Sequence, residues 1–553
     1  MSAEGALVAA LMLLLIAGIL YPLLQVLSAA LLDNGWPTPG ALLAFFARPL
    51  YREALLNTLL SGALAVLFGS LIGVPLALLT VRYRFPGRGV LTALAMLPLV
   101  IPPFVGAIGF QQILGRSGAV NAVLLERLGF TVPFMEGLAG VVLVQTLHYF
   151  PFIFLNTAAA LSGLDRSLEE AAQSLGSSGA RLFRRVLLPL ALPGYAVGAL
   201  LTFIQAIDDL GTPLMLNYTN LLAPQAYLRV TTAGLADADA YVICVILLAL
   251  SLGAFWASKA SLARGDFAAL GWDREASGIA LGPRGAALAW LVAVALLSPA
   301  LLPHLGLALL SVSQVWTLTP LPTVYTAGNY GEILFRSPQF IWNTLRYGLL
   351  AAAADIVLGG AIGWLLLRGR TRGRQWLDTI ATMPLAIPGV VIAVGYLRVF
   401  HGWSVPGLGE PLTATWLILV IVYAMRRLPY TVHGAYGALQ QLPLALEEAG
   451  QSLGANRART FWKITLPLMG RGLLAGGLLA FVAAAVDFSS TMLLVPGVEL
   501  GPLSYGIYLY MQSAVGKGAG AALGMTAVAL MAAGAWAATR LAGRSAGYSI
   551  FRA

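Results

Sequence analysis

Long apolar runs separated by short polar loops make up most of this 553-residue chain. The hydrocarbon core of a bilayer requires roughly 20 apolar residues per helix, and runs of that length predict about twelve membrane-spanning helices here. The runs form two series of six. The first series covers 5–30, 56–80, 89–112, 137–161, 194–214 and 238–258, and the second covers 285–312, 342–367, 376–400, 412–438, 470–495 and 518–540.

The two series are copies of one sequence. Glu170 and Glu448 lie 278 positions apart, whereas "NTLLSGAL" at Asn57 and "NTLRYGLL" at Asn343 lie 286 apart, as do Pro98 and Pro384. An insertion of about eight residues near 113–136 of the first copy would explain the change. An even number of spans makes the copies parallel, so we expect two halves around a pseudo-twofold axis and a central path. The offset of 278 also relates Gly176 to Gly454, Phe183 to Phe461, Pro189 to Pro467, Pro151 to Pro429 and Asp209 to Asp487.

The repeat predicts an all-α polytopic membrane protein whose first and second halves are 1–260 and 285–540. A linker at 261–284 and a tail at 541–553 complete the chain. The first apolar run has no basic n-region and is too long for a signal peptide, so we interpret it as a retained span. The single cysteine, Cys244, excludes a disulfide framework and a cysteine-based metal site.

The charge distribution agrees with a membrane protein. Only 10% of the residues are charged, against about 25% in soluble domains, and 59% are hydrophobic. The net charge of +10 does not indicate nucleic-acid binding, because the basic residues lie in short loops, where they set topology. All of these loops lie on the cytoplasmic side if both termini are cytoplasmic. The basic residues are Arg82, Arg84, Arg88, Lys259, Arg264, Arg274, Arg284, Arg368, Arg370, Arg372, Arg374, Arg540, Arg544 and Arg552.

Two polar decamers interrupt the apolar pattern, "SLEEAAQSLG" at 167–176 and "ALEEAGQSLG" at 445–454. Their residues favour a helix, which Asp165 or Ser167 could cap in the first copy, with Glu169 and Glu170 in its first turn. Gly176 and Gly454 should end the two helices. A second, basic amphipathic stretch follows, and we expect a proline to end it before the next span. Its residues are Arg181, Arg184, Arg185 and Pro189 in one copy and Arg457, Arg459, Lys463 and Pro467 in the other.

The segments 165–193 and 443–471 resemble the EAA loop of the permeases of binding-protein-dependent (type I) ABC importers, and the whole chain resembles their fused double permeases. The resemblance implies that each loop forms a coupling helix that docks on a cytoplasmic ATPase. The alternative is an interfacial helix pair that only orients its neighbours. The implied coupling residues are Glu169, Glu170, Ala171, Ala172 and Gly176, with Glu447, Glu448, Ala449, Gly450 and Gly454.

The family further implies two copies of an ATPase that binds ATP and Mg²⁺, a periplasmic binding protein, and alternating access in the bacterial inner membrane. No segment of this chain resembles a phosphate-binding "GxxxxGK[ST]" loop, so we expect neither a bound cofactor nor enzymatic activity in it. One departure is Gly450, which stands where the family pattern has alanine and would loosen that helix by up to about 1 kcal/mol.

Charged residues inside spans are candidates for function. Asp208 and Asp209 lie in "QAIDDLGTP" and Asp487 in "AAVDFSSTM", and Asp209 and Asp487 should face each other across the axis. We consider a gate lined by carboxylates and hydroxyls, or a structural Asp–Arg network. With four histidines and one cysteine, no metal site is expected. The other candidates for the path are Thr212, Ser489, Ser490, Arg426, Arg427 and His148, the last beside Tyr149.

The substrate is less clearly indicated. "LPLVIPPFVGAIGF" and "DDLGTP" are similar to the ferric-iron branch of fused permeases, and relatives with the same layout carry thiamine, aminoethylphosphonate or other small anions. Carboxylates would suit a cation, whereas an arginine pair would suit an anion or anion-chelated iron. The main alternative class is a secondary transporter driven by an ion gradient, which would not need the two decamers. A membrane-embedded enzyme is less consistent, because no residue cluster has catalytic spacing.

Overall fold

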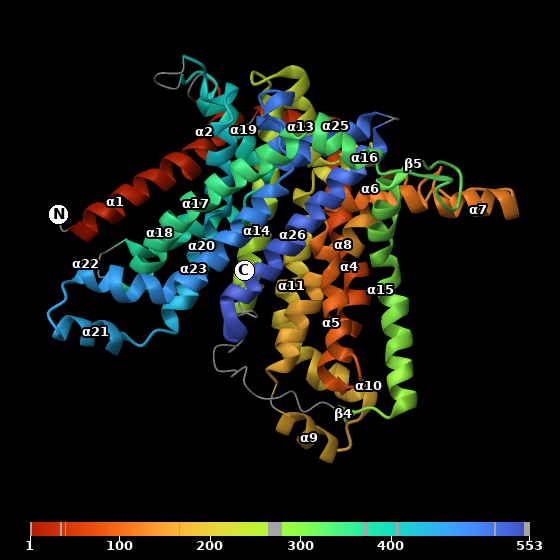
Figure 1. Ribbon diagram of the computed structural model, residues 1–553, viewed down its shortest axis with the longest axis horizontal. Coiled ribbons are helices and arrows are strands. Elements are labelled where there is room, and N and C mark those ends of the chain that lie inside the picture. Colours follow the sequence, from red (N-terminus) through yellow and green to blue (C-terminus); the bar gives the residue numbers. More distant parts are fainter. Residues whose placement is uncertain are drawn as a thin grey trace. The chain divides into compact units, whose positions relative to one another are not determined.

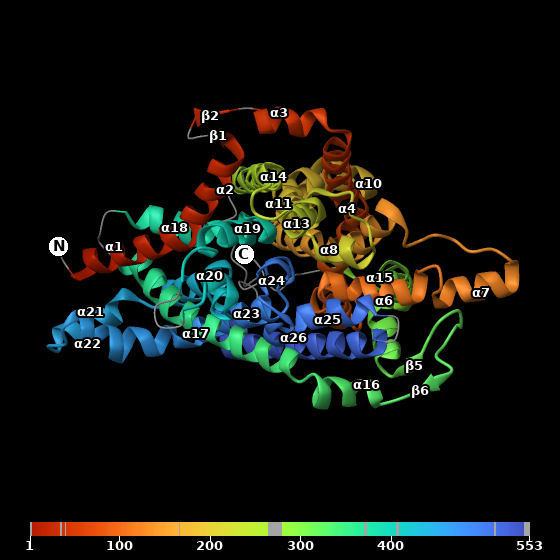
Figure 2. The same cartoon turned by 90° about the horizontal axis from the view of Figure 1, so that it is seen from above.

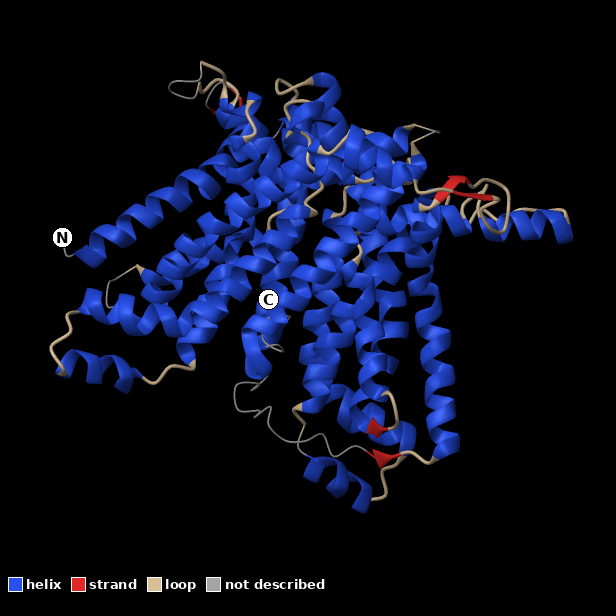
Figure 3. Ribbon diagram, in the orientation of Figure 1, coloured by secondary structure: helices blue, strands red, loops and turns tan. Residues whose placement is uncertain are grey.

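The computed structural model describes residues 3–546 apart from 34–35, 39, 165, 264–278, 370–372, 405–408 and 514–515. Within these residues the chain is almost entirely helical (Figure 3). Three short two-stranded pairings are the only sheets described: β1 (Leu32–Asp33) with β2 (Trp36–Pro37), β3 (Tyr83–Arg84) with β4 (Ile279–Ala280), and β5 (Ser313–Val315) with β6 (Val324–Tyr325). The candidate cap Asp165 and the loop arginines Arg264, Arg274, Arg370, Arg372 and Arg552 lie outside the described residues.

Nine described helices are long and apolar enough to cross a membrane, or up to eleven if each of two bent pairs is one span. The polytopic helical fold predicted from the sequence is therefore confirmed. Helix α20 (Leu417–Gln440) corresponds to the predicted span 412–438 but is not among the nine. It is 24 residues long and carries Arg426 and Arg427, which lower its hydropathy. It packs between two of the nine, α17 (Gln339–Arg368) and α23 (Leu466–Ala485), so we place it in the membrane with them.

The chain folds as two compact units (Figure 1). Unit 1 comprises residues 1–45, 226–245 and 330–553. In its core α20 packs between α17 and α23, and α23 also packs on α26 (Lys517–Ala546). The further helices of unit 1 are α1 (Ala3–Leu15), α2 (Tyr21–Leu31), α18 (Arg374–Thr382), α19 (Gly389–Phe400), α21 (Leu444–Ser452), α22 (Arg457–Thr460), α24 (Ser489–Leu494) and α25 (Leu503–Gln512), with the short turns η1 (Ile16–Leu20), η5 (Glu332–Arg336), η6 (Met383–Ala386), η7 (Leu412–Ala414), η8 (Phe461–Thr465) and η9 (Val498–Leu500).

Unit 2 comprises residues 46–225 and 246–329. Its core repeats that of unit 1, because α8 (Gly137–Ser162) packs between α4 (Pro49–Arg82) and α11 (Leu188–Asp208). The further helices of unit 2 are α5 (Arg88–Met96), α6 (Pro103–Leu114), α7 (Ala119–Leu128), α9 (Arg166–Ser174), α10 (Gly179–Leu182), α12 (Gly211–Met215) and α15 (Pro283–Ser311), with η2 (Leu97–Val100) and η3 (Phe183–Leu187). Four helices cross a border between the units: α3 (Gly40–Ala47), α13 (Leu222–Ala233), α14 (Ala238–Ala263) and α16 (Gly328–Gly331).

The first long helix of each repeat packs in the unit that holds the core of the other repeat. In unit 1, α2 lies along α19 (Figure 2), and the Tyr396 hydroxyl donates to the carbonyl of Gly18 at 2.7 Å. In unit 2, α15 packs on α6. Both crossings bring two backbones together, because a Cβ added at Gly109 would lie 2.1 Å from the Pro303 carbonyl oxygen, and one at Gly395 would lie 2.8 Å from that of Pro22. Glycine permits this approach in each case.

The third predicted span of each half is not a straight helix. The segment from Arg88 to Val100 meets the helix that follows it at 99°, and the segment from Arg374 to Ala386 meets α19 at 110°. Pro102 and Pro388 stand at the two bends. Proline supplies no N–H donor and disfavours a helical residue before it, so a continuous helix cannot pass these positions without distortion.

Candidate functional site

The first polar decamer forms α9. Glu169 lies in its first turn, whereas Glu170 lies one residue beyond that turn, contrary to the prediction that both would occupy it. Helix α9 ends at Ser174, and Gly176, the residue predicted to end it, follows with a φ of +80°, a left-handed conformation that favours glycine. The backbone N–H of Ser177 donates to the carbonyl of Ala172 at 2.9 Å, which is the hydrogen bond of a Schellman end.

The second decamer repeats this geometry in α21. Glu447 lies in the first turn, Gly454 has a φ of +87°, and the N–H of Ala455 donates to the carbonyl of Gly450 at 3.1 Å. The glycine at 450 has a packing reason, since a Cβ there would lie 2.5 Å from Cδ1 of Ile464. The departure from the family pattern therefore accommodates a larger neighbour in η8.

Both loop helices, α9 and α21, have an inner and an exposed face. The side chains of Glu169 and Glu447 are half-buried. Leu175 and Leu453 are 89% and 90% exposed, although leucine is normally covered in a folded protein. On the exposed face lie Glu170, Ala171, Glu448 and Ala449, whereas Ala172 and Gly450 are half-buried.

The half-buried glutamates are ion-paired to the ends of long helices. Glu169 accepts from Arg82, the last residue of α4, and Glu447 accepts from Nε of Arg368, the last residue of α17, at 3.0 Å. The two arginines were predicted only as topology signals. Their exposed side-chain fractions are 17% and 15%, so both pairs are largely shielded from solvent.

The basic stretch after each loop helix does not end at the proline, so that prediction is wrong. Helix α10 continues through the π-helical turn η3 directly into α11, in which Pro189 occupies the first turn. Pro467 has the same place in α23, after η8. Each proline lies two residues after a π-helical turn, whose i→i+5 hydrogen bonds depart from the α-helical ladder that a proline interrupts. Each loop thus continues without a break into the following span.

Asp487 lies at a break in the second half, between α23 and α24. Asp487 is 3% exposed, and its carboxylate pairs with Arg426 and accepts from Nη2 of Arg427 at 2.7 Å. Its other oxygen accepts from the backbone N–H of Ser490 at 3.0 Å, which caps α24. The Ser504 hydroxyl, at the start of α25, donates to the Asp487 carbonyl at 2.8 Å. Asp487 therefore joins three helices in a buried ionic network.

Asp209 lies at the equivalent break, between α11 and α12, without an arginine. Its carboxylate accepts from the backbone N–H of Thr212 at 3.0 Å and from Nε2 of Gln145 at 3.4 Å. Gln145 also donates to the carbonyl of Ala206 at 3.0 Å, whereas its own oxygen is buried with no hydrogen-bond partner. Both halves therefore use an aspartate to cap the helix after the break, and only the second half adds an ion pair.

Not all of the predicted path residues meet. Arg426, Arg427, Asp487 and Ser490 form one network, and Asp209 contacts Thr212. Asp208, the last residue of α11, is half-buried, as is Ser489. His148 is buried, with its ring edge-on to Tyr149 at 4.7 Å between centroids. Sequence reasoning missed Gln145 and Ser504, because neither an amide nor a serine in an apolar run signals a partner.

A comparison with known protein families decides what this repeated architecture is. The family model described as "Binding-protein-dependent transport system inner membrane component" matches residues 65–260 and again residues 355–546. The two matches cover more than half of the chain, and each contains one loop helix and one helix break. The chain belongs to this family. It is therefore a multi-pass permease of the inner membrane, a non-catalytic part of an ABC transporter complex that includes an ATPase and a binding protein.

The permease is similar to ferric and to molybdenum transport permeases, among other relatives. The ferric transport system permease protein FbpB of Actinobacillus pleuropneumoniae is 26% identical over 86% of this chain and 69% of its own length. The Fe(3+)-transport system permease protein FbpB 2 of Haemophilus influenzae is 26% identical over 84% of this chain and 86% of its own. The molybdenum transport system permease protein ModB of Escherichia coli K12 is 33% identical, but over 36% of this chain and 88% of its own.

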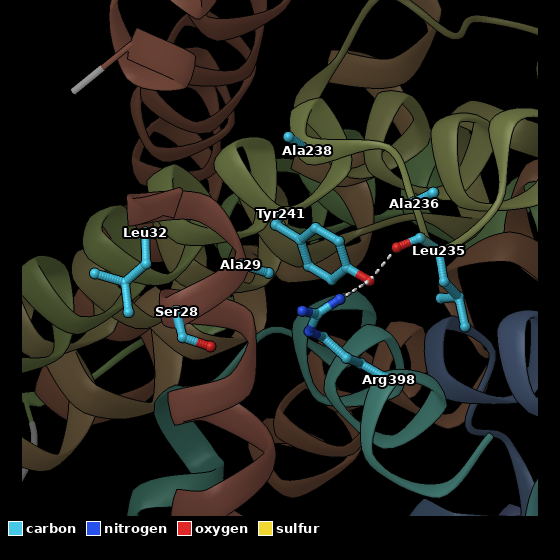
Figure 4. Close-up of a pocket in the computed structure, with 8 residues that line it drawn as sticks. All are labelled: Ser28, Ala29, Leu32, Leu235, Ala236, Ala238, Tyr241 and Arg398. Atoms are coloured by element: carbon cyan, nitrogen blue, oxygen red, sulfur yellow. Dashed lines mark hydrogen bonds between the residues drawn. The ribbon is translucent and has the colours of Figure 1, made fainter. Parts of the chain in front are cut away.

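Unit 1 of the permease also has a pocket of about 380 Å³ at the start of α14 (Figure 4). Nη1 of Arg398 donates to the hydroxyl of Tyr241 at 3.3 Å, and that hydroxyl donates to the carbonyl of Leu235 at 2.7 Å. The guanidinium lies 5.0 Å from the centre of the Tyr241 ring, a cation–π contact that joins α19 to α14. None of the predicted path residues lines this pocket.

Proposed function

We propose that this permease carries both membrane halves of an importer for ferric iron. The observation that supports this choice is the extent of the similarity to the ferric permeases, which runs through 84% and 86% of the chain and so includes both halves. A relative that shares only one half supports a common fold and a common coupling mechanism, but gives less support for a common cargo.

In this proposal α9 and α21 lie in the cytoplasm and dock on two copies of an ATPase that binds ATP and Mg²⁺. Both termini are then cytoplasmic. The exposed Leu175 and Leu453 would enter apolar pockets of the ATPases, and the exposed Glu170 and Glu448 would meet basic side chains around them. Apolar anchors with a polar rim are the usual composition of a protein interface. Ala171 and Ala449 share this exposed face.

In this proposal each half lines the cargo path at its own helix break, and the cargo arrives from the periplasmic binding protein. The contacts of Asp487 favour the structural alternative in the second half, because both carboxylate oxygens are already engaged with Arg426, Arg427 and Ser490. Asp209 makes weaker contacts and is the better candidate for a carboxylate that meets a cation. Asp208, Thr212, Ser489 and His148 remain candidates for the lining of this path.

The test is transport by the permease reconstituted with its ATPase and binding protein in vesicles. We expect uptake of ferric iron that requires ATP, and no uptake driven by an ion gradient alone. Uptake that persists without ATP would contradict the importer mechanism. A binding protein that holds thiamine or a phosphonate, and not ferric iron, would contradict the choice of cargo.

Substitutions on the exposed faces of α9 and α21 test whether these helices dock on the ATPase. Changing both Glu170→Lys and Glu448→Lys, or both Leu175→Asp and Leu453→Asp, should abolish co-purification of the ATPase. Glu126→Lys with Glu410→Lys is the matched control, because both side chains are exposed, one in each repeat, and neither lies in a loop helix. Retention of the ATPase by the two loop-helix variants would contradict docking at α9 and α21.

Molybdate is a second candidate cargo. The observation that favours it is the 33% identity to ModB, which exceeds the 26% identity to the ferric permeases although it covers one half. Uptake of radioactive molybdate in the same vesicles, in competition with ferric iron, separates the two candidates.

A further inference from the structure

Two long helices, α4 and α17, are held at both ends by side chains that occupy the same places in the two repeats. The contacts at one end are the ion pairs Arg82–Glu169 and Arg368–Glu447. Each pair joins the last residue of a long helix to the first turn of a loop helix. The arginine lies at the negative end of one helix dipole and the glutamate at the positive end of another, so both dipoles favour the pair.

These ion pairs form although the intervening chain differs in length. Arg82 and Glu169 are 87 positions apart, whereas Arg368 and Glu447 are 79 apart. The difference arises in the segment between α6 and α8, which contains α7, a helix with no counterpart between α19 and α20 among the described residues. The same ends meet in both halves, so the contact does not follow from sequence spacing alone. Arg368 adds a hydrogen bond from Nη2 to the carbonyl of Leu442 at 2.9 Å, just before α21.

At the other end, the Asn-Thr pair of the repeated "NTL" motif binds the segment that begins the next short helix. Nδ2 of Asn57 donates to the carbonyl of Asn220 at 3.2 Å, and the buried Thr58 hydroxyl accepts from the N–H of Leu222 at 2.9 Å. Leu222 is the first residue of α13. The motif thus supplies one of the acceptors that a helix N-terminus requires.

The second repeat makes the same contacts. Nδ2 of Asn343 donates to the carbonyl of Gly501 at 3.0 Å, and the Thr344 hydroxyl accepts from the N–H of Leu503 at 2.7 Å. Leu503 is the first residue of α25, which follows the break at Asp487 just as α13 follows the break at Asp209. Nothing in the EAA loop requires this motif at the far end of a helix of 30 residues or more.

We propose that α4 and α17 are struts that carry the displacement of each loop helix across the membrane to α13 and α25. Arg82, Glu169, Arg368 and Glu447 are positioning residues at one end, and the two Asn-Thr pairs are positioning residues at the other. This inference rests on the proposed function, because it takes α9 and α21 as the docking elements. It also assigns different tasks to the paired acids, since Glu170 and Glu448 face the ATPase whereas Glu169 and Glu447 hold the strut.

The experiment measures cargo transported per ATP hydrolysed by the complete complex in vesicles, normalised to assembled complex. Arg82→Gln with Arg368→Gln should retain the co-purified ATPase and lower this ratio about tenfold, the size of effect seen when a coupling contact is lost. Arg84→Gln is the matched control. It removes one positive charge two residues after Arg82, where Arg84 is exposed on β3, so comparison with Arg82→Gln alone tests whether the arginine acts only through topology.

Exchange of the charges, as Arg82→Glu with Glu169→Arg and Arg368→Glu with Glu447→Arg, should recover only part of the ratio, because the pairs form again while both helix dipoles now oppose them. Thr58→Val with Thr344→Val removes the acceptor at the far end and should lower the ratio as the arginine changes do. An unchanged ratio in the arginine or threonine variants would overturn the struts. So would loss of the ATPase on changing Arg82 and Arg368. If the unaltered permease retains no ATPase, the proposed function itself fails, and the two failures are thus distinguished.

Discussion

Single residues show how far the two repeats have diverged while keeping one geometry. The first repeat has Ala172 and Val186 where the second has Gly450 and Ile464. The larger residue of η8 faces the smaller residue of α21, and the Cβ missing from Gly450 is the atom that would meet Ile464. From the sequence, Gly450 indicated only a weakened helix. The compensating contact could not be predicted, because the sequence does not show which side chain covers the glycine.

This compensation predicts a coupled pair of substitutions. Gly450→Ala should not raise the thermal stability of the permease, because the gain in helix propensity of about 1 kcal/mol is offset by overpacking against Ile464. In the background of Ile464→Val, the same change should be stabilising, with a coupling free energy of about 1 kcal/mol. Thermal unfolding of the four proteins in detergent measures this cycle. Additive effects would show that the two sites are independent.

At the scale of elements, the breaks at Asp209 and Asp487 share a capping role and differ in charge. Asp487→Asn should destabilise the permease by about 3 kcal/mol, because the buried Arg426 and the half-buried Arg427 lose their carboxylate. Asp209→Asn should cost less than about 1 kcal/mol, since asparagine caps a helix nearly as well as aspartate and no arginine is left unpaired. Thermal unfolding in detergent is the measurement, and equal losses would contradict the difference between the two breaks.

The sequence predicted which elements exist better than it predicted where they bend. All twelve apolar runs correspond to helices, because the requirement to bury about 20 apolar residues per span leaves few alternatives. The bends at Pro102 and Pro388 and the continuous helix through Pro189 were not predicted. Proline ends a helix in some positions and begins one in others, and its effect depends on the turn before it.

The candidate site was predictable to a similar extent. The loop helices and their glycine ends follow from residue types and repeat offsets, whereas the Asp–Arg network was one of two alternatives that the sequence left open. The partners of Glu169, Asn57 and Thr58 could not be predicted, because they lie 87, 163 and 164 positions away in the sequence. The type of a polar side chain does not indicate which distant residue it will contact.

The two compact units of the molecule do not coincide with the two sequence repeats. Helices α1 and α2 belong to the first repeat but pack in unit 1, and α15 belongs to the second repeat but packs in unit 2. Apolar helices present similar surfaces to lipid and to one another, so sequence patterns alone did not assign the first helix of each repeat to its neighbours. Glycines such as Gly109 and Gly395 mark the close helix crossings, but nothing in the sequence distinguishes them from the other glycines of the apolar runs.

This exchange predicts the behaviour of a divided chain. When the chain is cut between residues 263 and 279, the two fragments should be stable together and unstable apart, because each lacks a helix that completes its core. Co-expression with a tag on one fragment should recover both and restore ATPase binding. The accumulation of either fragment alone as a monodisperse protein in detergent would contradict the prediction.

The exchanged helices also bear on the ancestry of the chain. A single repeat would leave the glycine surfaces of Gly109 or Gly395 uncovered, so an unfused ancestor would need to assemble in pairs, each copy lending its first helix to the other. In a fused chain, a substitution can change one half without changing the other. In a pair of identical copies, an arginine gained at one site appears twice, whereas in the fused chain Arg426 and Arg427 stand opposite one aspartate while His148 and Tyr149 keep the other half free of added charge. The fused gene can therefore specialise its two sides separately.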